Sequence, residues 1–157
     1  MQRFPVSGQI LRSRTAIRTS DTRHFVDPSI AAASLGIGPD DLLNDLNTMG
    51  LLFESMCVRD LRVFSEALDG SVYHYRDKTG LECDAVVHLR NGSYALIEVK
   101  LGGKEIDLAA ENLLRLKNKI DTDRMKKPSF LMVITGTEYA YQREDDVYVV
   151  PLGCLKV

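Results

Sequence analysis

The chain has 157 residues, of which 45% are hydrophobic and 27% are charged, and 20 basic against 22 acidic side chains give a formal charge of −2. These values exclude collagen-like and low-complexity chains and predict one folded domain with a single core. No apolar run approaches the roughly 20 residues that span a bilayer, and the first residues lack the apolar stretch of a secretory signal. We therefore expect a cytoplasmic protein without a membrane partner, whose three widely spaced cysteines are free thiols.

Residues 1–47 are expected to form an arm and short helices that pack on the rest of the chain. A short strand is predicted over 24–26. Asp27 followed by proline predicts a helix over 28–35, because an aspartate N-cap and a proline in the first turn favour helix initiation. A second short helix is expected after Pro39.

Residues 48–157 are predicted to form the core, in the order αβββαβ with one extra strand. The apolar spacing changes from helical to alternating and back along this segment. The expected elements are a helix over 48–68, strands over 72–75, 82–89 and 94–100, a helix over 105–120, and strands over 130–134 and 147–150. The expected fold class is therefore α/β, more narrowly an α+β fold with a mixed sheet.

Four charged residues lie at positions that this periodicity places in the core. Glu98 and Lys100 share a face of the strand 94–100, Asp84 interrupts the strand before it, and Glu54 lies on the apolar stripe of the long helix. Burying such charges costs several kcal/mol unless each finds a partner. A divalent cation with its waters would neutralise the carboxylates together, since a few carboxylates and water commonly hold Mg²⁺. An internal network of ion pairs would explain the same residues.

The turn between strands 82–89 and 94–100 decides whether Asp84 and Glu98 can meet. A two-residue Asn91-Gly92 turn places Asp84 opposite Val99, on the face away from Glu98. A three-residue loop over 90–92, with Gly92 in the left-handed conformation, places Asp84 opposite Glu98. We expect the three-residue loop, because it requires glycine at its third position.

These residues carry a resemblance to known families. Asp84 followed by Glu98-Val99-Lys100, after a helix bearing Glu54 and in the order αβββαβ, resembles the PD-(D/E)XK nuclease superfamily with its restriction-endonuclease-like fold. A further resemblance, to the C-terminal domain of unknown function of a family of prokaryotic AAA-type ATPases, spans nearly the whole chain. It is carried by the segments 24–29, 50–54, 75–77, 82–84 and 96–100. That domain is itself regarded as a PD-(D/E)XK relative.

The resemblance implies metal-dependent hydrolysis of DNA phosphodiester bonds. Asp84, Glu98 and Lys100 would be the catalytic residues, and Glu54, Asp84 and Glu98 would hold Mg²⁺ or Mn²⁺. Lys100 would position or help deprotonate the attacking water and steady the charge on the phosphate. Two basic stretches, 1–24 and 115–127, could contact the DNA backbone or form solvated surface.

Glu82 lies two residues before Asp84 on the same strand. It is either an outer ligand of the metal or a partner of Arg76, and both residues are assigned to a candidate outer shell. Of the two, the outer-ligand role is the less expected one.

The second family also implies a partner, an ATPase module that normally lies upstream in the same chain. The present sequence has no G-x-x-x-x-G-K-[ST] loop, since Gly102-Gly103-Lys104-Glu105 lacks both the spacing and the hydroxyl, so we expect no ATP hydrolysis from this chain. It is either a fragment of a longer ATPase or a stand-alone protein. The alternatives to a nuclease are a non-catalytic DNA-binding module and an interaction module that regulates the ATPase.

Overall fold

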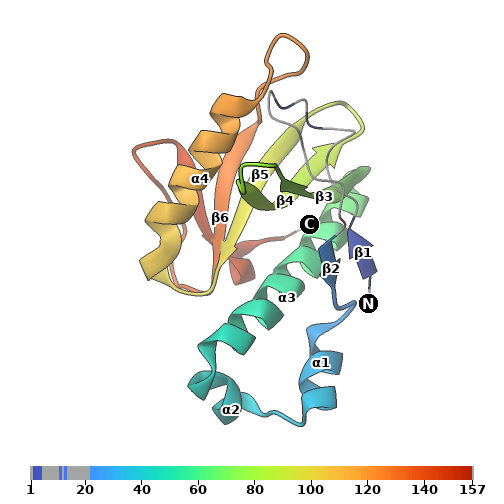
Figure 1. The fold of residues 1–157 in the computed structure, drawn as a ribbon, viewed down its shortest axis with the longest axis vertical. Helices are drawn as coiled ribbons and strands as arrows, with labels where there is room; N and C mark the ends of the chain where they lie inside the picture. Colours follow the sequence, from blue (N-terminus) through green and yellow to red (C-terminus); the bar gives the residue numbers. More distant parts are fainter. Residues whose placement is uncertain (1, 5–10, 12, 14–21, 157) are drawn as a thin grey trace.

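A six-stranded mixed sheet lies between two long helices in the computed structural model (Figure 1), which describes all residues except 1, 5–10, 12, 14–21 and 157. The order in the sheet is β3-β4-β5-β6-β8-β7. The strands are β3 (Gly70–Arg76), β4 (Glu82–Leu89), β5 (Tyr94–Lys100), β6 (Phe130–Thr135), β7 (Tyr141–Gln142) and β8 (Val147–Pro151). The helices are α1 (Pro28–Leu35), α2 (Pro39–Asn44), α3 (Leu46–Ala67) and α4 (Ile106–Lys119). The fold is therefore α+β, as the sequence predicts.

The strand directions follow from the connections. The hairpins make β3, β4 and β5 antiparallel, whereas β6 runs parallel to β5 because α4 crosses over between them. A second, two-stranded sheet pairs β1 (Gln2–Phe4) with β2 (Thr22–His24). From α3 onward the observed order is αβββαβ with additional strands at the end, which confirms the predicted order.

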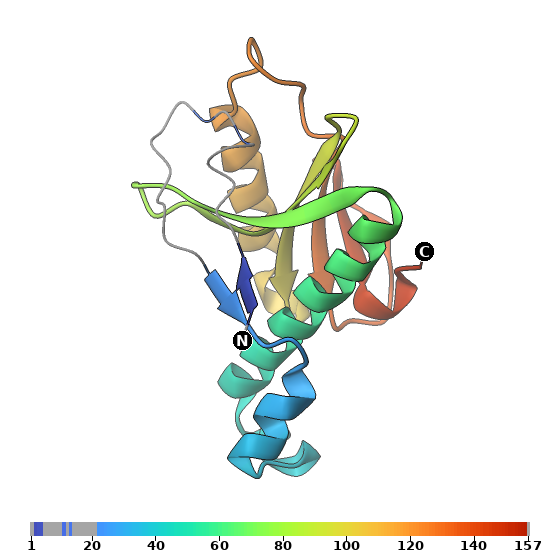
Figure 2. The same ribbon diagram turned by 90° about the vertical axis from the view of Figure 1, so that its right-hand side faces the viewer.

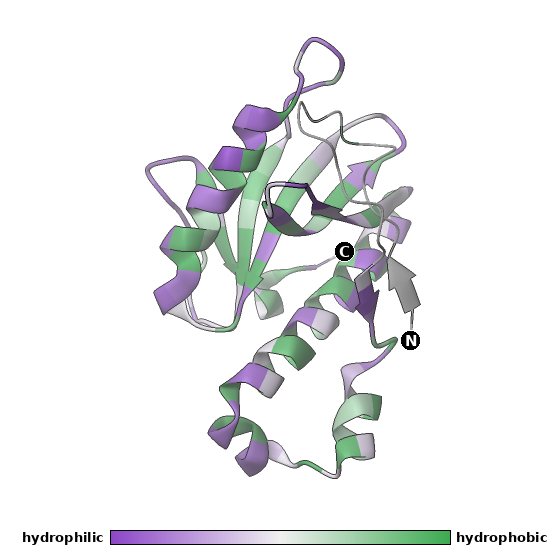
Figure 3. Cartoon of the chain, viewed as in Figure 1, coloured by the Kyte–Doolittle hydropathy of each residue, from purple (hydrophilic) through white to green (hydrophobic). Residues whose placement is uncertain are grey.

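The helices α3 and α4 cover opposite faces of the sheet (Figure 2). Leu96 packs in one core with Leu113 of α4, and Ile97 packs in the other core with Leu61 of α3. Apolar residues accordingly line the central strands, while the outer surface of α4 is hydrophilic (Figure 3). Glu98 is thus held on a strand that is buried on both faces.

Local capping explains where the N-terminal helices start. Asp27 Oδ1 accepts a hydrogen bond from the backbone N–H of Ser29 (2.8 Å), and α1 covers the predicted residues 28–35. The long helix α3 begins at Leu46 rather than at Thr48. The predicted start was wrong because Asp45 is the N-cap, and its carboxylate accepts hydrogen bonds from the N–H and hydroxyl of Thr48.

The sequence analysis was also wrong about the short strands. The strand predicted over 24–26 covers 22–24 instead and pairs with β1, which was not predicted. The two-residue strand β7 was also missed and pairs with β8. Such short pairings depend on distant partners and leave no periodicity of their own in the sequence.

The hairpin between β4 and β5 has the predicted three-residue loop. Leu89 N–H donates to Ser93 O at 2.8 Å, and Gly92 has φ 82°. Ala85 pairs with Ile97 and Val86 pairs with Leu96, which confirms the register that places Asp84 opposite Glu98.

Because Gly92 has a left-handed backbone, Gly92→Ala should lower the free energy of unfolding by about 1 kcal/mol. Gly102 has φ −120° and open space around its Cα, so Gly102→Ala should leave stability unchanged or raise it slightly. Urea denaturation of both variants measures the difference. Equal stability of the two variants would contradict the assigned loop conformation.

Candidate functional site

A β-bulge in β4 lies at the centre of the site. Tyr73 pairs with Val86 and Tyr75 pairs with Cys83, so Asp84 and Ala85 together oppose one residue of β3. A bulge bends the strand and redirects a side chain, and bulges are common next to active sites. The backbone pairs of β4 with β5 end at Ala85, next to this bulge.

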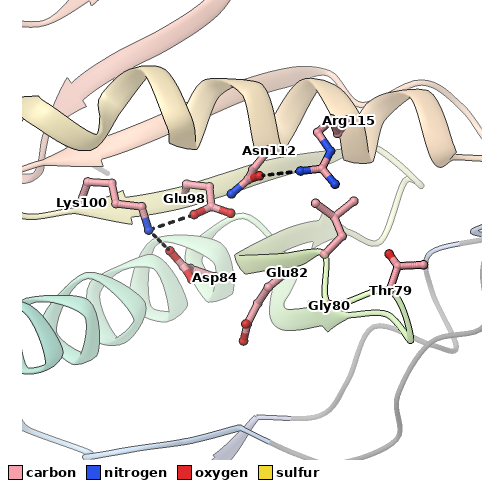
Figure 4. Close-up of a pocket in the computed structure, with 9 residues that line it drawn as sticks. Thr79, Gly80, Glu82, Asp84, Glu98, Lys100, Asn112 and Arg115 are labelled. Atoms are coloured by element: carbon pink, nitrogen blue, oxygen red, sulfur yellow. Dashed lines mark hydrogen bonds and ion pairs between the residues drawn. The ribbon is translucent and has the colours of Figure 1, made fainter.

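The side chain of Asp84 bonds to β5 beyond the point where the backbone pairing of β4 with β5 stops. Its Oδ2 accepts a hydrogen bond from the backbone N–H of Val99 at 2.8 Å. The Nζ atom of Lys100 lies 3.7 Å from Asp84 Oδ2 and 3.1 Å from Glu98 Oε2. The fold therefore brings together the three residues that the sequence singles out as catalytic, and their arrangement is shown in Figure 4.

The three side chains open onto a polar pocket of about 430 Å³. The turn between β3 and β4 contributes Thr79 and Gly80 to its wall, and α4 contributes Asn112 and Arg115 (Figure 4). Glu98 is only 3% exposed, whereas the side chain of Lys100 is 25% exposed. The ammonium group thus lies between a buried carboxylate and the polar pocket.

Glu54 approaches the same cluster from α3. Its carboxylate lies 3.8 Å from Nε2 of the buried His24. Glu54 also interacts electrostatically with Asp84 and Lys100. Helix α3 therefore adds a third acidic side chain beside the pair on β4 and β5.

Glu82 lies between two cationic or ionisable neighbours. Its Oε2 is 3.8 Å from Arg76 Nε, and its Oε1 is 3.0 Å from Nε2 of His74. In the described part of the chain neither ring nitrogen of the buried His74 makes a well-aligned hydrogen bond, so its approach to Glu82 is a close contact without hydrogen-bond geometry. Glu82 is thus a partner of Arg76, and it also lines the pocket.

The crowding of carboxylates changes their proton affinities. Burial, reinforced by the charge of Asp84, raises the pKa of Glu98 to about 8, and the attraction of Lys100 only partly opposes this. Burial also raises the pKa of Glu54 to about 7, again with Asp84 adding to the shift. Burial lowers the pKa of Lys100, but Asp84 and Glu98 outweigh it and raise that pKa above its usual value.

The carboxylates of the site already have one cationic partner, which bears on whether they can also hold a metal ion. Asp84 and Glu98 already converge on one positive group, the ammonium of Lys100. Among the described residues, no three His, Cys, Asp or Glu side chains are arranged to ligate one ion. Binding of an ion by Asp84 and Glu98 with water completing its coordination, the mode usual for Mg²⁺, therefore stays a prediction. Direct ligation by Glu54 stays a prediction.

Asp77 organises the turn that forms one wall of the pocket. Its carboxylate accepts hydrogen bonds from the backbone N–H groups of Thr79 and Leu81, and Lys119 Nζ of α4 lies 2.8 Å from Oδ2. Burial alone raises the pKa of Asp77, yet these hydrogen bonds outweigh burial and lower the pKa to about 2. The turn is thereby tied to the end of α4.

Sequence reasoning missed the roles of Asp77, Asn112 and Arg115. An aspartate three residues before Gly80 is a turn signal that could have identified Asp77. Nothing in the helical pattern distinguishes Asn112 and Arg115 from other polar residues of α4. Three of the five basic residues in 1–24, Arg12, Arg14 and Arg18, lie outside the described residues, so the predicted DNA contact by that stretch lies largely outside them.

Comparison with known proteins places the chain in one family. Residues 49–155 match the family described as Domain of unknown function (DUF4143), and the chain belongs to this family. No curated protein matches the sequence significantly, and no solved structure does so either. None of the helices in the described part of the chain has the length and apolar character required to cross a bilayer.

Replacing Lys119 with methionine should remove the cation that balances the buried Asp77. We expect Lys119→Met to lower the free energy of unfolding at pH 7 by about 3 kcal/mol, measured by urea denaturation. Lys117→Met, two residues earlier on α4, is the control and should cost less than about 1 kcal/mol. Because the pKa of Asp77 is lowered, its contribution to stability is present above about pH 4 and is lost as the pH falls toward 2. Similar losses in the two variants would contradict the role assigned to Asp77.

The raised pKa of Glu98 predicts the opposite pH dependence at the site. Between about pH 4.5 and 8 the folded state holds a proton that the unfolded chain has lost, so stability should fall as the pH rises. Glu98→Gln should remove more than about 1 kcal/mol of this decline, measured by denaturation at several pH values. Glu111→Gln, at an exposed position of α4, should keep the wild-type slope. If stability depends on pH in the same way in the wild type and in Glu98→Gln, Glu98 does not hold a proton in the folded state.

Proposed function

We propose that this domain is a metal-dependent nuclease that hydrolyses phosphodiester bonds of DNA. The observation that supports the proposal most strongly is the convergence of Asp84, Glu98 and Lys100 where β4 and β5 separate. The order αβββαβ, with β6 parallel to β5, agrees with the resemblance to PD-(D/E)XK nucleases. The buried carboxylates and the polar pocket supply the remaining chemical requirements.

Each residue of the cluster has a role in the proposed reaction. Asp84 and Glu98 would hold Mg²⁺ or Mn²⁺, and Glu54 would add negative charge directly or through water. A bound divalent ion supplies a water of lowered pKa and screens the phosphate charge. Lys100 stays protonated at neutral pH, so it can orient a water molecule and donate to a phosphate oxygen. The hydrogen bond from Val99 keeps Asp84 oriented.

The pocket also suits a phosphate-bearing substrate. The exposed Arg115 and the exposed Lys78 lie on the two elements that border the pocket, α4 and the turn held by Asp77. Their positive charges can neutralise phosphates on either side of the scissile bond. An AAA-type ATPase module is the proposed partner, because the second family resemblance implies one.

A cleavage assay tests the proposed reaction. Labelled linear, branched and single-stranded DNA is incubated with the protein and Mn²⁺ or Mg²⁺, alone and together with an ATPase module of the resembled family plus ATP. We expect metal-dependent cleavage that falls about 100-fold or more in Lys100→Met, a variant that keeps the aliphatic stem of the side chain.

Glu111→Gln is the matched control and should cleave DNA as the wild type does. Circular dichroism establishes that Lys100→Met is folded. Cleavage that persists in EDTA, or equally in Lys100→Met, would contradict the proposal, and so would the absence of cleavage under every condition.

A second candidate function is an ATPase-regulating interaction module that retains the fold without the reaction. The contact of Asp84 with both Val99 N–H and Lys100 favours this alternative, because the carboxylate is satisfied without a metal. In that case Mn²⁺ should not raise the melting temperature, since no ion binds the folded state. Deletion of the domain should then alter ATPase assembly while DNA remains intact.

A further inference from the structure

The N-terminal helices present an apolar surface that the described part of the chain leaves uncovered. Helix α1 buries only Ala31, α2 buries no residue, and α3 buries none before Ser55. Leu35, Leu43 and Leu51 are each at least 63% exposed. These leucines lie on three helices, of which α1 and α2 each contact α3, and a large exposed apolar surface commonly marks an interaction site.

A groove runs through this surface between α1 and α3, next to α2, with a volume of about 260 Å³. Two of its lining residues are methionines, whose flexible side chains adapt to the shape of a bound partner. The apolar lining residues are Ala32, Leu42, Met49, Leu52, Phe53 and Met56. Figure 3 shows hydrophobic segments on α1 and on the adjoining half of α3.

The charge around the groove is mainly negative, although Arg59 of α3 pairs with Asp27 at 3.3 Å. Residues 24–58 contain five acidic residues and neither lysine nor arginine. Asp40 and Asp41 are exposed on α2, and the exposed Asp45 caps α3 one turn before Met49. A partner that covers the apolar floor would therefore meet negative charge at the edge.

We propose that this groove binds an amphipathic helix of a partner protein that carries lysine or arginine beside its apolar face. Helix-in-groove recognition uses apolar side chains spaced three and four residues apart, which match a floor made by two packed helices. Basic flanking residues complement the acidic edge and increase the rate of association. This proposal does not rest on the nuclease reaction, because none of the residues that line the groove belongs to the Asp84 cluster, although Glu54 directly follows Phe53 on α3.

Fluorescence anisotropy with a synthetic peptide tests the inference on the complete chain. The labelled probe is an amphipathic peptide of about 18 residues with leucine on one face and lysine at its flanks. The matched peptide replaces every lysine with glutamate and keeps the leucines. We expect saturable binding of the basic peptide, about tenfold or more tighter than that of the acidic peptide.

Variants locate the binding surface. Met49→Gln should weaken binding of the basic peptide about tenfold, and Asp40→Lys should weaken it less and reduce its salt dependence. Leu108→Gln changes an exposed leucine on α4, away from the groove, and should bind as the wild type does. Thermal melting of each variant establishes that it is folded.

Three outcomes would overturn the inference. These are the absence of binding, equal binding of the two peptides, and equal effects of Met49→Gln and Leu108→Gln. Sedimentation equilibrium of the protein alone identifies a different occupant, a second copy of the chain. A stable dimer that Met49→Gln dissociates, with no binding of the basic peptide, would assign the groove to self-association and contradict the proposed partner.

Discussion

The hydrogen bond from Val99 N–H to Asp84 determines how the sheet opens at the site. A backbone N–H on a central strand must have a partner, because leaving it buried and unpaired costs about 1–3 kcal/mol. At the bulge that partner is a carboxylate instead of a carbonyl of β4. Because the carboxylate of Asp84 takes the place of a carbonyl, β4 can diverge from β5 while the N–H of Val99 keeps a hydrogen-bond partner. The same hydrogen bond holds Asp84 beside Glu98 and Lys100.

The same arrangement explains why buried charges are tolerated near the sheet. Lys100 neutralises one of the two carboxylates, and the raised pKa of Glu98 shows that the second is energetically costly as an anion. The turn that precedes Glu82 is held by a different interaction, the buried pair of Asp77 and Lys119. One pair is balanced and stabilises the fold, whereas the Asp84 cluster keeps a proton on Glu98 that a further cation would displace.

Most of the fold could be predicted from the sequence because most of its elements are determined by residues close together in the chain. The helix 28–35, the strands 82–89 and 94–100 and the three-residue loop depend on caps, alternation and one glycine. The bulge at Asp84 could not be predicted, since it depends on the pairing of β4 with β3. The same limit applies to Arg115 and Asn112, whose approach to the pocket depends on how α4 packs. The charged residues were identified because their chemistry contradicts the apolar pattern around them.

Titration calorimetry with Mn²⁺ tests most directly whether the Asp84 cluster is a cation site. The protein is titrated near pH 7.5 in two buffers of different ionisation enthalpy, which reveals proton release on binding. We expect one ion per chain, release of protons because Glu98 must ionise, and loss of binding in Asp84→Asn. No binding by the wild type, or the same heat and stoichiometry in Asp84→Asn, would contradict a metal site at this cluster.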